Sequence, residues 1–273
     1  MNEIAWTDLQ NGKHRVPCPS CFRSERDKTL GLKIEAGAGV AHCFRCQYVE
    51  KWRDPRPTVP RRPQAQRPLE AHSILSQFGR MLWAQSLPVA ETIGASYLAA
   101  RACVLPPADG DLRYHPALKH PLTGHIGPSL LALVTDIRTR EPISLHRTWI
   151  NADGTKPVDP PRMLLGGHRK TGGAIRLWPD EWVTKGLGVA EGIETALSLA
   201  HAYQPVWSLI DGGNLGKLPV LLGIQSLLIA ADNDPSGREA AHSCATRWAA
   251  AGAEVLVTQQ TTNDLNDALR EAA

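Results

Sequence analysis

The chain has 273 residues, of which 42% are hydrophobic, so it can form one large domain or two to three small ones around packed cores. No apolar run approaches the length of a membrane span, and the start lacks the basic-then-apolar order of a signal peptide, so we expect a cytoplasmic protein with no membrane partner and no disulfides. The net charge of +3 is uneven: residues 1–68 hold 13 Lys and Arg against 7 Asp and Glu, whereas residues 183–273 hold 5 against 10. A basic front favours contact with phosphate backbones, and an acidic end that meets phosphates requires cations.

Four cysteines near the start follow the pattern C-x2-C-x21-C-x2-C. They are Cys18, Cys21, Cys43 and Cys46. Each C-x2-C pair can close a tight knuckle around one metal ion, and four thiolates suit tetrahedral zinc, so the nearby His14 and His42 are not needed as ligands. Between the pairs, residues 29–44 read as two short strands joined by a Gly-rich turn. Residues 1–53 are therefore predicted to form a zinc ribbon whose folding energy comes from zinc binding.

Basic residues surround the predicted knuckles and favour contact with nucleic acid, although a purely structural ribbon is the alternative. These residues are Arg15, Arg23, Arg26, Lys28, Lys33 and Arg45. The next segment, residues 54–68, contains five prolines and four arginines, which no helix or strand tolerates. We expect an extended, semi-rigid and basic linker there. Its arginines can contact a polyanion, but a linker that is merely solvated has a similar composition.

Residues 69–182 are predicted to form a mixed α+β region, because apolar residues at helical spacing are followed by short strand-like runs. The predicted elements are helices over residues 69–87 and 91–102 and an antiparallel pair of strands over residues 129–136 and 142–150. In the second helix, Tyr97 and Leu98 are expected to face the core.

Basic residues in this region are candidates for binding nucleotide phosphates or a template. Residues 163–178 carry two Gly pairs around a basic triplet, and glycine lets the backbone approach phosphates closely; the alternative is a plain exposed hairpin tip. On the strand over residues 142–150, His146 is more often structural than catalytic. The candidates are Arg147, His168, Arg169 and Lys170.

Residues 183–273 alternate between strands and helices, which predicts an α/β fold with a parallel sheet and helices on its faces. The predicted strands cover residues 186–192, 205–210, 226–232 and 253–259. Ligands of such sheets bind beyond the carboxyl ends of the strands.

Carboxylates gather at those strand ends. They are Glu191 after the first strand, Asp232 and Asp234 after the third, and Asp264 and Asp267 after the fourth. At about 6 Å and an effective dielectric constant of about 20, two carboxylates repel by about 3 kcal/mol. Lys217 is the single Lys or Arg between residues 186 and 237, so magnesium or manganese is expected to offset the repulsion. The alternative for either aspartate of the third strand is a helix N-cap.

Two segments resemble the Toprim domain, which bacterial-type primases share with type IA and type II topoisomerases and some nucleases: VAEGIETALS and IAADNDPSG. The resemblance matches Glu191 to the glutamate after the first strand of that family, and Asp232 and Asp234 to its D-x-D pattern. The tail TTNDLNDAL resembles the Asp- and Asn-rich end of such primases, which implies that Asp264 and Asp267 lie near the magnesium site.

The front of the chain resembles the zinc-binding domain of the same primases, with CPSC and HCFRC as its two knuckles. The cellular bacterial version has histidine where Cys21 stands, and four-cysteine versions are typical of phage and plasmid (mobile-element) proteins. The segments YLAARACVLP, LHRTWINADG and EGIETALS, in that order, also look like a phage- or plasmid-borne primase family.

The resemblance implies a DNA primase, a nucleotidyltransferase that makes short RNA primers from ribonucleoside triphosphates on a single-stranded DNA template. Glu191, Asp232 and Asp234 are then expected to bind two catalytic magnesium or manganese ions, in addition to a structural zinc ion. No P-loop pattern occurs in the sequence, so a separate replicative helicase is the expected partner. The alternatives are a Toprim nuclease and a nucleic-acid-binding regulator that has lost catalysis.

Overall fold

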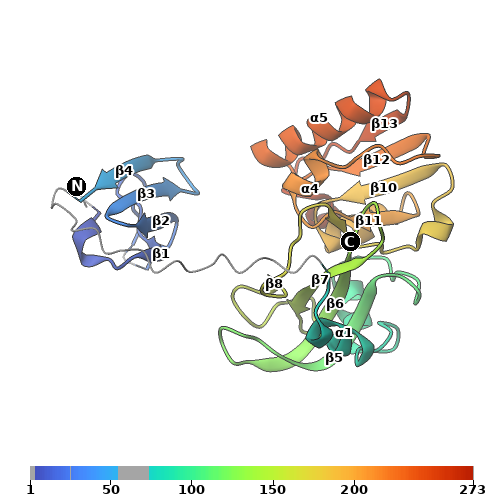
Figure 1. Cartoon of the computed structure of the whole chain (residues 1–273), viewed down its shortest axis with the longest axis horizontal. Helices are drawn as coiled ribbons and strands as arrows, with labels where there is room; N and C mark the ends of the chain where they lie inside the picture. Colours follow the sequence, from blue (N-terminus) through green and yellow to red (C-terminus); the bar gives the residue numbers. More distant parts are fainter. Residues whose placement is uncertain (1–3, 25, 55–73, 273) are drawn as a thin grey trace. The chain divides into compact units, whose positions relative to one another are not determined.

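The computed structural model describes residues 4–24, 26–54 and 74–272. The chain divides into two units, Met1–Arg67 and Pro68–Ala273 (Figure 1). The basic linker predicted over residues 54–68 lies outside the described residues except for Asp54. Within the described ranges, none of the helices combines the length and the apolar character needed to cross a membrane.

The first unit is an antiparallel sheet of four strands that follow one another in chain order. Its elements are η1 (Trp6–Asp8), β1 (Gly12–Val16), β2 (Leu30–Glu35), β3 (Ala38–Cys43) and β4 (Val49–Arg53). The strands β2 and β3 are the two that the sequence predicts, and their glycine-rich turn holds Ala36 and Gly37 at positive φ. The sequence does not predict β1 and β4, because their residues are mostly polar and exposed. One face of the sheet packs a small core around Leu32 and around Trp6, which stacks on Trp52 at 5.7 Å.

The middle of the chain contains two helices and an antiparallel sheet, which confirms the predicted α+β character. Its elements are α1 (Gln77–Ala84), α2 (Ile93–Ala100), β5 (Leu112–Lys119), β6 (Ile126–Asp136), β7 (Pro142–Trp149), β8 (Arg162–Leu164), β9 (Gly173–Ala174) and η2 (Asp180–Trp182). The strands β6 and β7 form the predicted antiparallel pair, and Tyr97 and Leu98 are buried as predicted. Both helices are shorter than predicted, and each begins later because the side chains of Ser76 and Thr92 cap their first turns. The predicted start of the first helix, residues 69–73, lies outside the described residues.

From residue 186 onward the chain forms a four-stranded parallel sheet in the order β11-β10-β12-β13, with helices on its faces. The elements are β10 (Gly186–Ala190), α3 (Ile193–Leu199), β11 (Val206–Ser208), α4 (Gly212–Gly216), β12 (Ser226–Ala230), α5 (Pro235–Ala250), β13 (Glu254–Val257) and α6 (Leu265–Ala272). This confirms the predicted alternation of strands and helices, and with it the α/β class. The central strand β10 is buried along its whole length, as expected for a parallel strand covered on both faces.

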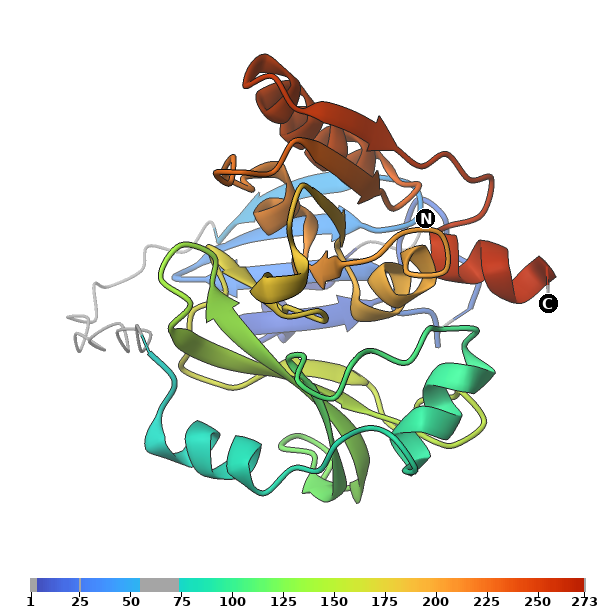
Figure 2. The same cartoon turned by 90° about the vertical axis from the view of Figure 1, so that its right-hand side faces the viewer.

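The middle region and the parallel sheet share a hydrophobic core. Ile143 of the antiparallel sheet lies in the same buried cluster as Ala190 and Ile193. A β-bridge between Ile175 and Ser208 also joins the middle region to the edge strand β11. Figure 2 shows the green strands of the middle region below the orange and red elements of the parallel sheet. Loops of the middle region therefore lie close to the parallel sheet.

Candidate functional site

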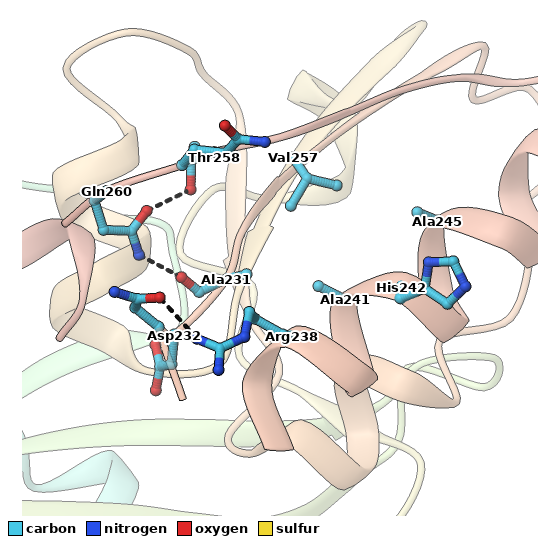
Figure 3. A pocket seen from close by; sticks show the side chains of 11 residues that line it. Ala231, Asp232, Arg238, Ala241, His242, Ala245, Val257, Thr258 and Gln260 are labelled. Atoms are coloured by element: carbon cyan, nitrogen blue, oxygen red, sulfur yellow. Dashed lines mark hydrogen bonds between the residues drawn. The ribbon is translucent and has the colours of Figure 1, made fainter. Parts of the chain in front are cut away.

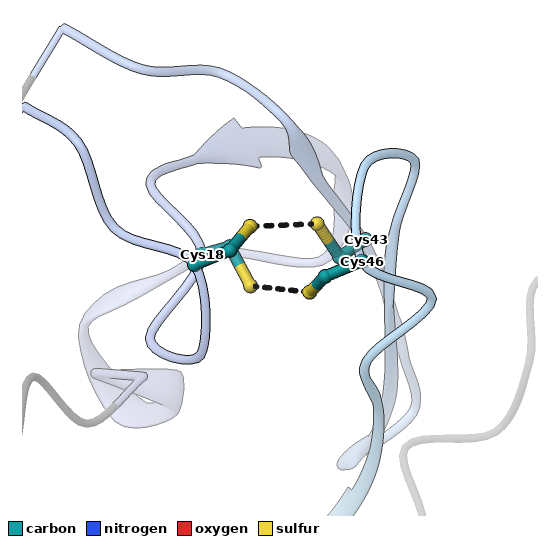
Figure 4. A group of neighbouring side chains, drawn as sticks. Cys18, Cys43 and Cys46 are labelled. Atoms are coloured by element: carbon teal, nitrogen blue, oxygen red, sulfur yellow. Dashed lines mark hydrogen bonds between the residues drawn. The ribbon is translucent and has the colours of Figure 1, made fainter.

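Four cysteines of the first unit lie together, as the sequence predicts (Figure 4). They are Cys18, Cys21, Cys43 and Cys46. Their Sγ atoms all lie within 4.8 Å of one another, and two pairs are 3.7 and 3.6 Å apart. Tetrahedral zinc with Zn–S bonds of about 2.3 Å holds its sulfurs about 3.8 Å apart, so the cluster fits a structural zinc ion. Across the described residues, no other group of three or more His, Cys, Asp or Glu is brought together in this way.

Two carboxylates stand at the carboxyl edge of the parallel sheet, at the ends of neighbouring strands. Glu191 follows β10 directly, Asp232 follows β12, and the last residues of the two strands, Ala190 and Ala230, are paired in register. Glu191 Oε1 and Asp232 Oδ1 are buried and are the only carboxylate oxygens of the described residues that are buried without a hydrogen-bond partner. A buried polar atom without a partner destabilises the fold unless a ligand satisfies it, so each such atom requires an explanation.

The pKa values of both carboxyls show that the acids of this edge interact. Burial raises the pKa of Glu191 to about 7, and the negative charges of Asp232, Asp234 and Asp211 add to the rise. Burial, together with the charges of Asp264 and Asp234, raises the pKa of Asp232 to about 6. A divalent cation removes such repulsion, and magnesium and manganese prefer carboxylate oxygens as ligands. The residues present therefore fit the predicted metal.

Asp234 has different surroundings from Asp232. It is exposed, and its Oδ1 accepts hydrogen bonds from the Gly237 N–H at 2.7 Å and from the Ser236 hydroxyl at 2.8 Å, so it is the N-cap of α5. These bonds lower the pKa of Asp234. Glycine is required at position 237, because a Cβ there would come within 2.5 Å of the Asp232 carbonyl oxygen. The N-cap alternative thus holds for Asp234, although its charge also raises the pKa of Glu191.

The acidic tail is attached to the D-x-D loop by its central residue, Asn233. The Asn233 side-chain amide donates a hydrogen bond to the Thr262 carbonyl at 3.0 Å. Asp264, two residues further on, accepts a hydrogen bond in the first turn of α6, and its charge raises the pKa of Asp232. Asp267 instead forms an ion pair within α6. The structure therefore brings Asp264, and not Asp267, into electrostatic contact with the acids of the sheet edge.

Comparison with family models divides the larger unit into two parts. Residues 186–273 match the model of the Toprim domain. This part of the chain is a Toprim domain. Residues 75–177 match the model of a domain of unknown function (DUF7146). Comparison of the sequence with curated proteins gives no match.

Several solved structures resemble the chain at low sequence identity. The primase fragment of the bacteriophage T7 primase-helicase protein is 15% identical, with a TM-score of 0.45 and 95% of each chain covered. The zinc-binding and RNA polymerase domains of the Aquifex aeolicus primase are 15% identical, with a TM-score of 0.43 over 95% of this chain and 75% of that one. A DNA primase domain from Pseudomonas aeruginosa is 15% identical, with a TM-score of 0.41 over 67% of this chain and 68% of that one.

A further carboxylate at the Toprim sheet edge is absent from the sequence prediction. Asp211 follows β11, and its side chain accepts a hydrogen bond from the Asn214 N–H at 2.9 Å at the start of α4. Its charge raises the pKa of Glu191, and its Oδ2 lies 2.5 Å from Lys170 Nζ. The sequence carries a signal for it, because LIDGGN places an acid and then glycine after an apolar strand, as AEG and DNDPSG do.

Glu194 lies one helical turn beyond Glu191 but belongs to a different environment. Its carboxylate is buried and bonds to the Tyr97 hydroxyl at 2.8 Å and to Lys156 and Arg162 at 2.9 Å each. Burial alone would raise the pKa of Glu194. The positive charges of Arg162 and Lys156 outweigh burial and hold this pKa well below its usual range. The charge of Arg162 also lowers the pKa of Asp232, so this guanidinium acts on the Toprim acids as well.

The side chains of the four predicted phosphate-binding residues have different partners. Lys170 reaches the Toprim acids through its ion pair with an aspartate after β11. Arg147 is buried, and its guanidinium lies 5.5 Å from the centre of the Trp149 ring. His168 accepts a hydrogen bond from the N-cap residue of α1, and Arg169 pairs with the last residue of β6 at 2.7 Å. The roles of these residues in binding nucleic acid stay predictions.

Proposed function

We propose that the protein is a DNA primase that synthesises short RNA primers on single-stranded DNA by metal-dependent nucleotidyl transfer. The observation that carries the proposal is the pair of buried, unpartnered carboxylate oxygens on Glu191 and Asp232 at the carboxyl edge of a Toprim sheet. The four-cysteine ribbon supports it, because the same chain then has a second, basic module that can hold a template.

Glu191 and Asp232 would hold magnesium or manganese through these oxygens, and Asp234 and Asp264 would add negative charge nearby. When bound, a pair of such ions lowers the pKa of an attacking 3′-hydroxyl and stabilises the charge of the leaving group. The repulsion among the ionised carboxylates favours uptake of the cations, since a bound cation relieves it without protonation of the acids.

Two cationic side chains next to the acids are suited to the triphosphate. The Lys170 side chain is 50% exposed and that of Arg162 is 46% exposed, so both can reach a ligand. Each is held by a carboxylate, Asp211 for Lys170 and Glu194 for Arg162, so its position is fixed before a substrate binds. In this hypothesis both donate hydrogen bonds to phosphate oxygens and neutralise their charge.

The outward face of the ribbon sheet is a candidate surface for the template strand. Phe44 is 64% exposed, with the Arg15 guanidinium 4.3 Å and the His42 ring 5.1 Å from its ring centre. The strand register places further cations on the same face, because directly paired residues of antiparallel strands point the same way. These cations are Lys13, Lys33, Lys51 and Arg53. An exposed aromatic ring among cations binds single strands by stacking and by charge.

The test is the synthesis of primers from labelled ribonucleoside triphosphates on single-stranded DNA with magnesium or manganese. Glu191→Gln and Asp232→Asn remove the charges, and we expect each to reduce synthesis at least about 100-fold, because bound metal ions supply several kcal/mol of transition-state stabilisation. Glu239→Gln, at an exposed position of α5, is the matched control and should keep wild-type activity. Primer synthesis at the wild-type level by the Glu191→Gln, Asp232→Asn double variant would contradict the proposed mechanism.

The same reactions separate the proposal from its alternatives. Metal-dependent cleavage of end-labelled DNA without primer products would identify a Toprim nuclease, and tight DNA binding with neither reaction would identify a regulator. A separate replicative helicase as partner and a cytoplasmic location, where thiolates stay reduced, belong to the same proposal.

A further inference from the structure

A pocket of about 350 Å³ lies beside Asp232, and the proposed metal chemistry makes no use of it. It runs between α5 on one side and β13 with its following loop on the other. Figure 3 shows Ala241 and Ala245 on the helix and Val257 on the strand, with Asp232 and Arg238 at one end. The volume lies within the range of about 300–1,000 Å³ of small-molecule sites.

The wall formed by the loop after β13 is fixed in the absence of a ligand. Gln260 donates its side-chain amide to the Ala231 carbonyl at 2.5 Å, and the Thr258 hydroxyl donates to Gln260 Oε1 at 3.2 Å. Further along the loop, Asn233 donates to the Thr262 carbonyl at 3.0 Å. The loop is therefore tied to the end of β12, and the pocket is already formed, as is usual for small-molecule sites.

The lining combines an apolar slot with polar groups at its rim. Ala241, Ala245 and Val257 line the slot with small or flat surfaces, which leave room for a planar ring. Arg238 and His242 lie on exposed turns of α5 at the rim and can donate hydrogen bonds. From Arg238 to Ala245 the helix rises about 10 Å, so the slot extends away from the acids along the helix.

We propose that this pocket takes the base and ribose of a ribonucleoside triphosphate whose phosphates lie at Asp232. The inference rests on the proposed function, because it assumes that the triphosphate is bound at the Toprim acids. Asp232 lines the pocket and also stands at the carboxyl edge of the Toprim sheet, so one ligand can extend from the sheet edge into the pocket. A nucleotide of the template strand has the same chemistry, but a pocket of about 350 Å³ with the tethered loop as one wall favours one free nucleotide over a continuous strand.

The test is calorimetric titration of the 273-residue chain, loaded with zinc, with ATP and magnesium in the absence of a template. Ala245→Leu fills the slot, and Ala249→Leu places the same side chain one turn further along α5 at an exposed position outside the pocket. We expect Ala245→Leu to bind ATP at least about tenfold more weakly, which corresponds to about 1.4 kcal/mol. Ala249→Leu should stay within about twofold of wild type.

Inorganic tripolyphosphate with magnesium is the second probe, because it has phosphates but neither base nor ribose. We expect Ala245→Leu and wild type to bind it equally. Equal ATP affinities in wild type and Ala245→Leu would overturn the inference, and so would an equal loss of ATP and tripolyphosphate binding. Weaker binding of an oligodeoxynucleotide with unchanged ATP binding would also overturn it, since the occupant would then be the template.

These results are independent of the test of the proposed function. If the wild-type protein makes no primers but its ATP affinity depends on Ala245, the nucleotide pocket stands and the polymerase activity does not. If Ala245→Leu makes primers with an unchanged KM for ATP, the pocket assignment fails and the primase proposal stands.

Discussion

Replacement of Glu194 by glutamine tests whether this acid serves the fold or the metal site. The Glu194 side chain is 7% exposed, and its Oε1 lies 2.9 Å from both Lys156 Nζ and the Arg162 guanidinium. Glutamine keeps the shape and an acceptor oxygen but removes the charge. Lys156 and Arg162 would then share a buried site without their counter-ion, which is destabilising.

The expected loss of stability follows from the burial of the three charges. Removing one partner of a buried ion pair costs about 3–5 kcal/mol, because a charge is left uncompensated. The Lys156 side chain is 17% exposed and that of Arg162 is 46% exposed, so water screens part of the remaining charge. We therefore expect a loss near the lower end, about 3 kcal/mol. At about 2–4 °C per kcal/mol for a domain of this size, Glu194→Gln should melt roughly 6–12 °C below wild type.

Thermal unfolding followed by near-ultraviolet circular dichroism measures this difference. Glu239→Gln, which removes an exposed charge from the same domain, is the control and should stay within about 0.5 kcal/mol of wild type. Tyr97→Phe removes only the hydrogen bond to Glu194 and should cost about 1 kcal/mol.

The difference in unfolding free energy between wild type and Glu194→Gln should depend on pH in a defined direction. Arg162 and Lys156 hold the pKa of Glu194 below its unfolded value of 4.5, against the opposing effect of burial. The folded state therefore binds this proton less tightly than the unfolded state, and the stabilisation is fully present above pH 4.5 and is lost as the pH falls below it. The difference in unfolding free energy between wild type and Glu194→Gln should be largest at neutral pH and should shrink in acid.

A second measurement decides the outcome if stability does not change. Titration with Mn²⁺, followed by electron paramagnetic resonance, should give the same affinity for Glu194→Gln and wild type. Equal melting temperatures together with weaker Mn²⁺ binding would refute the reasoning, because Glu194 would then be a metal ligand.

Three further outcomes are expected. Without added magnesium or manganese, burial raises the pKa of Glu191 to about 7, so the folded state binds this proton more tightly and the free energy of unfolding should fall as the pH rises from 4.5 to about 7. Melts at several pH values should show a smaller fall in Glu191→Gln, where Asp232, with its pKa raised to about 6, still contributes. Removal of zinc should unfold the ribbon, since zinc binding contributes about 10–16 kcal/mol in comparable modules, and Cys43→Ala should lose zinc in a metal assay. Phe44→Ala should weaken the binding of single-stranded DNA by about 1–3 kcal/mol, measured by fluorescence anisotropy, whereas Phe22→Ala, an exposed aromatic in the loop between β1 and β2, should not.

The parts of the site that sequence predicts are those set by local pattern. A C-x2-C spacing forms a knuckle independently of the rest of the chain. The cysteine cluster can therefore be predicted from the spacing of four cysteine residues. Glu191 and Asp232 lie at the same sheet edge because parallel neighbours in a sheet end there, and the strand pattern around each is strong. In both cases the local spacing of residues in the sequence is enough to predict which side chains come together or share an edge.

The parts that sequence does not predict depend on pairs of residues far apart in the chain. Lys156 and Arg162 lie on a segment with weak strand character, and nothing local indicates that they bond to Glu194. The basic triplet around Arg169 is a similar case: its glycines permit approach to phosphate, but its neighbours in space decide where each side chain points. Lys170 meets an acid of the sheet edge, while Arg169 pairs with the end of β6.

The contrast between Glu191 and Glu194 explains why one helical turn separates two functions. Both side chains are desolvated, which disfavours the charged form of each. At Glu194 the protein supplies two cations and a hydroxyl, so the charge is compensated within the fold and the pKa falls. At Glu191 the protein supplies further acids and leaves Oε1 without a partner, so the pKa rises and the charge is neutralised by a proton unless a cation binds. A fold that can neutralise a buried carboxylate at one position and leaves its neighbour uncompensated keeps the second one available for a ligand.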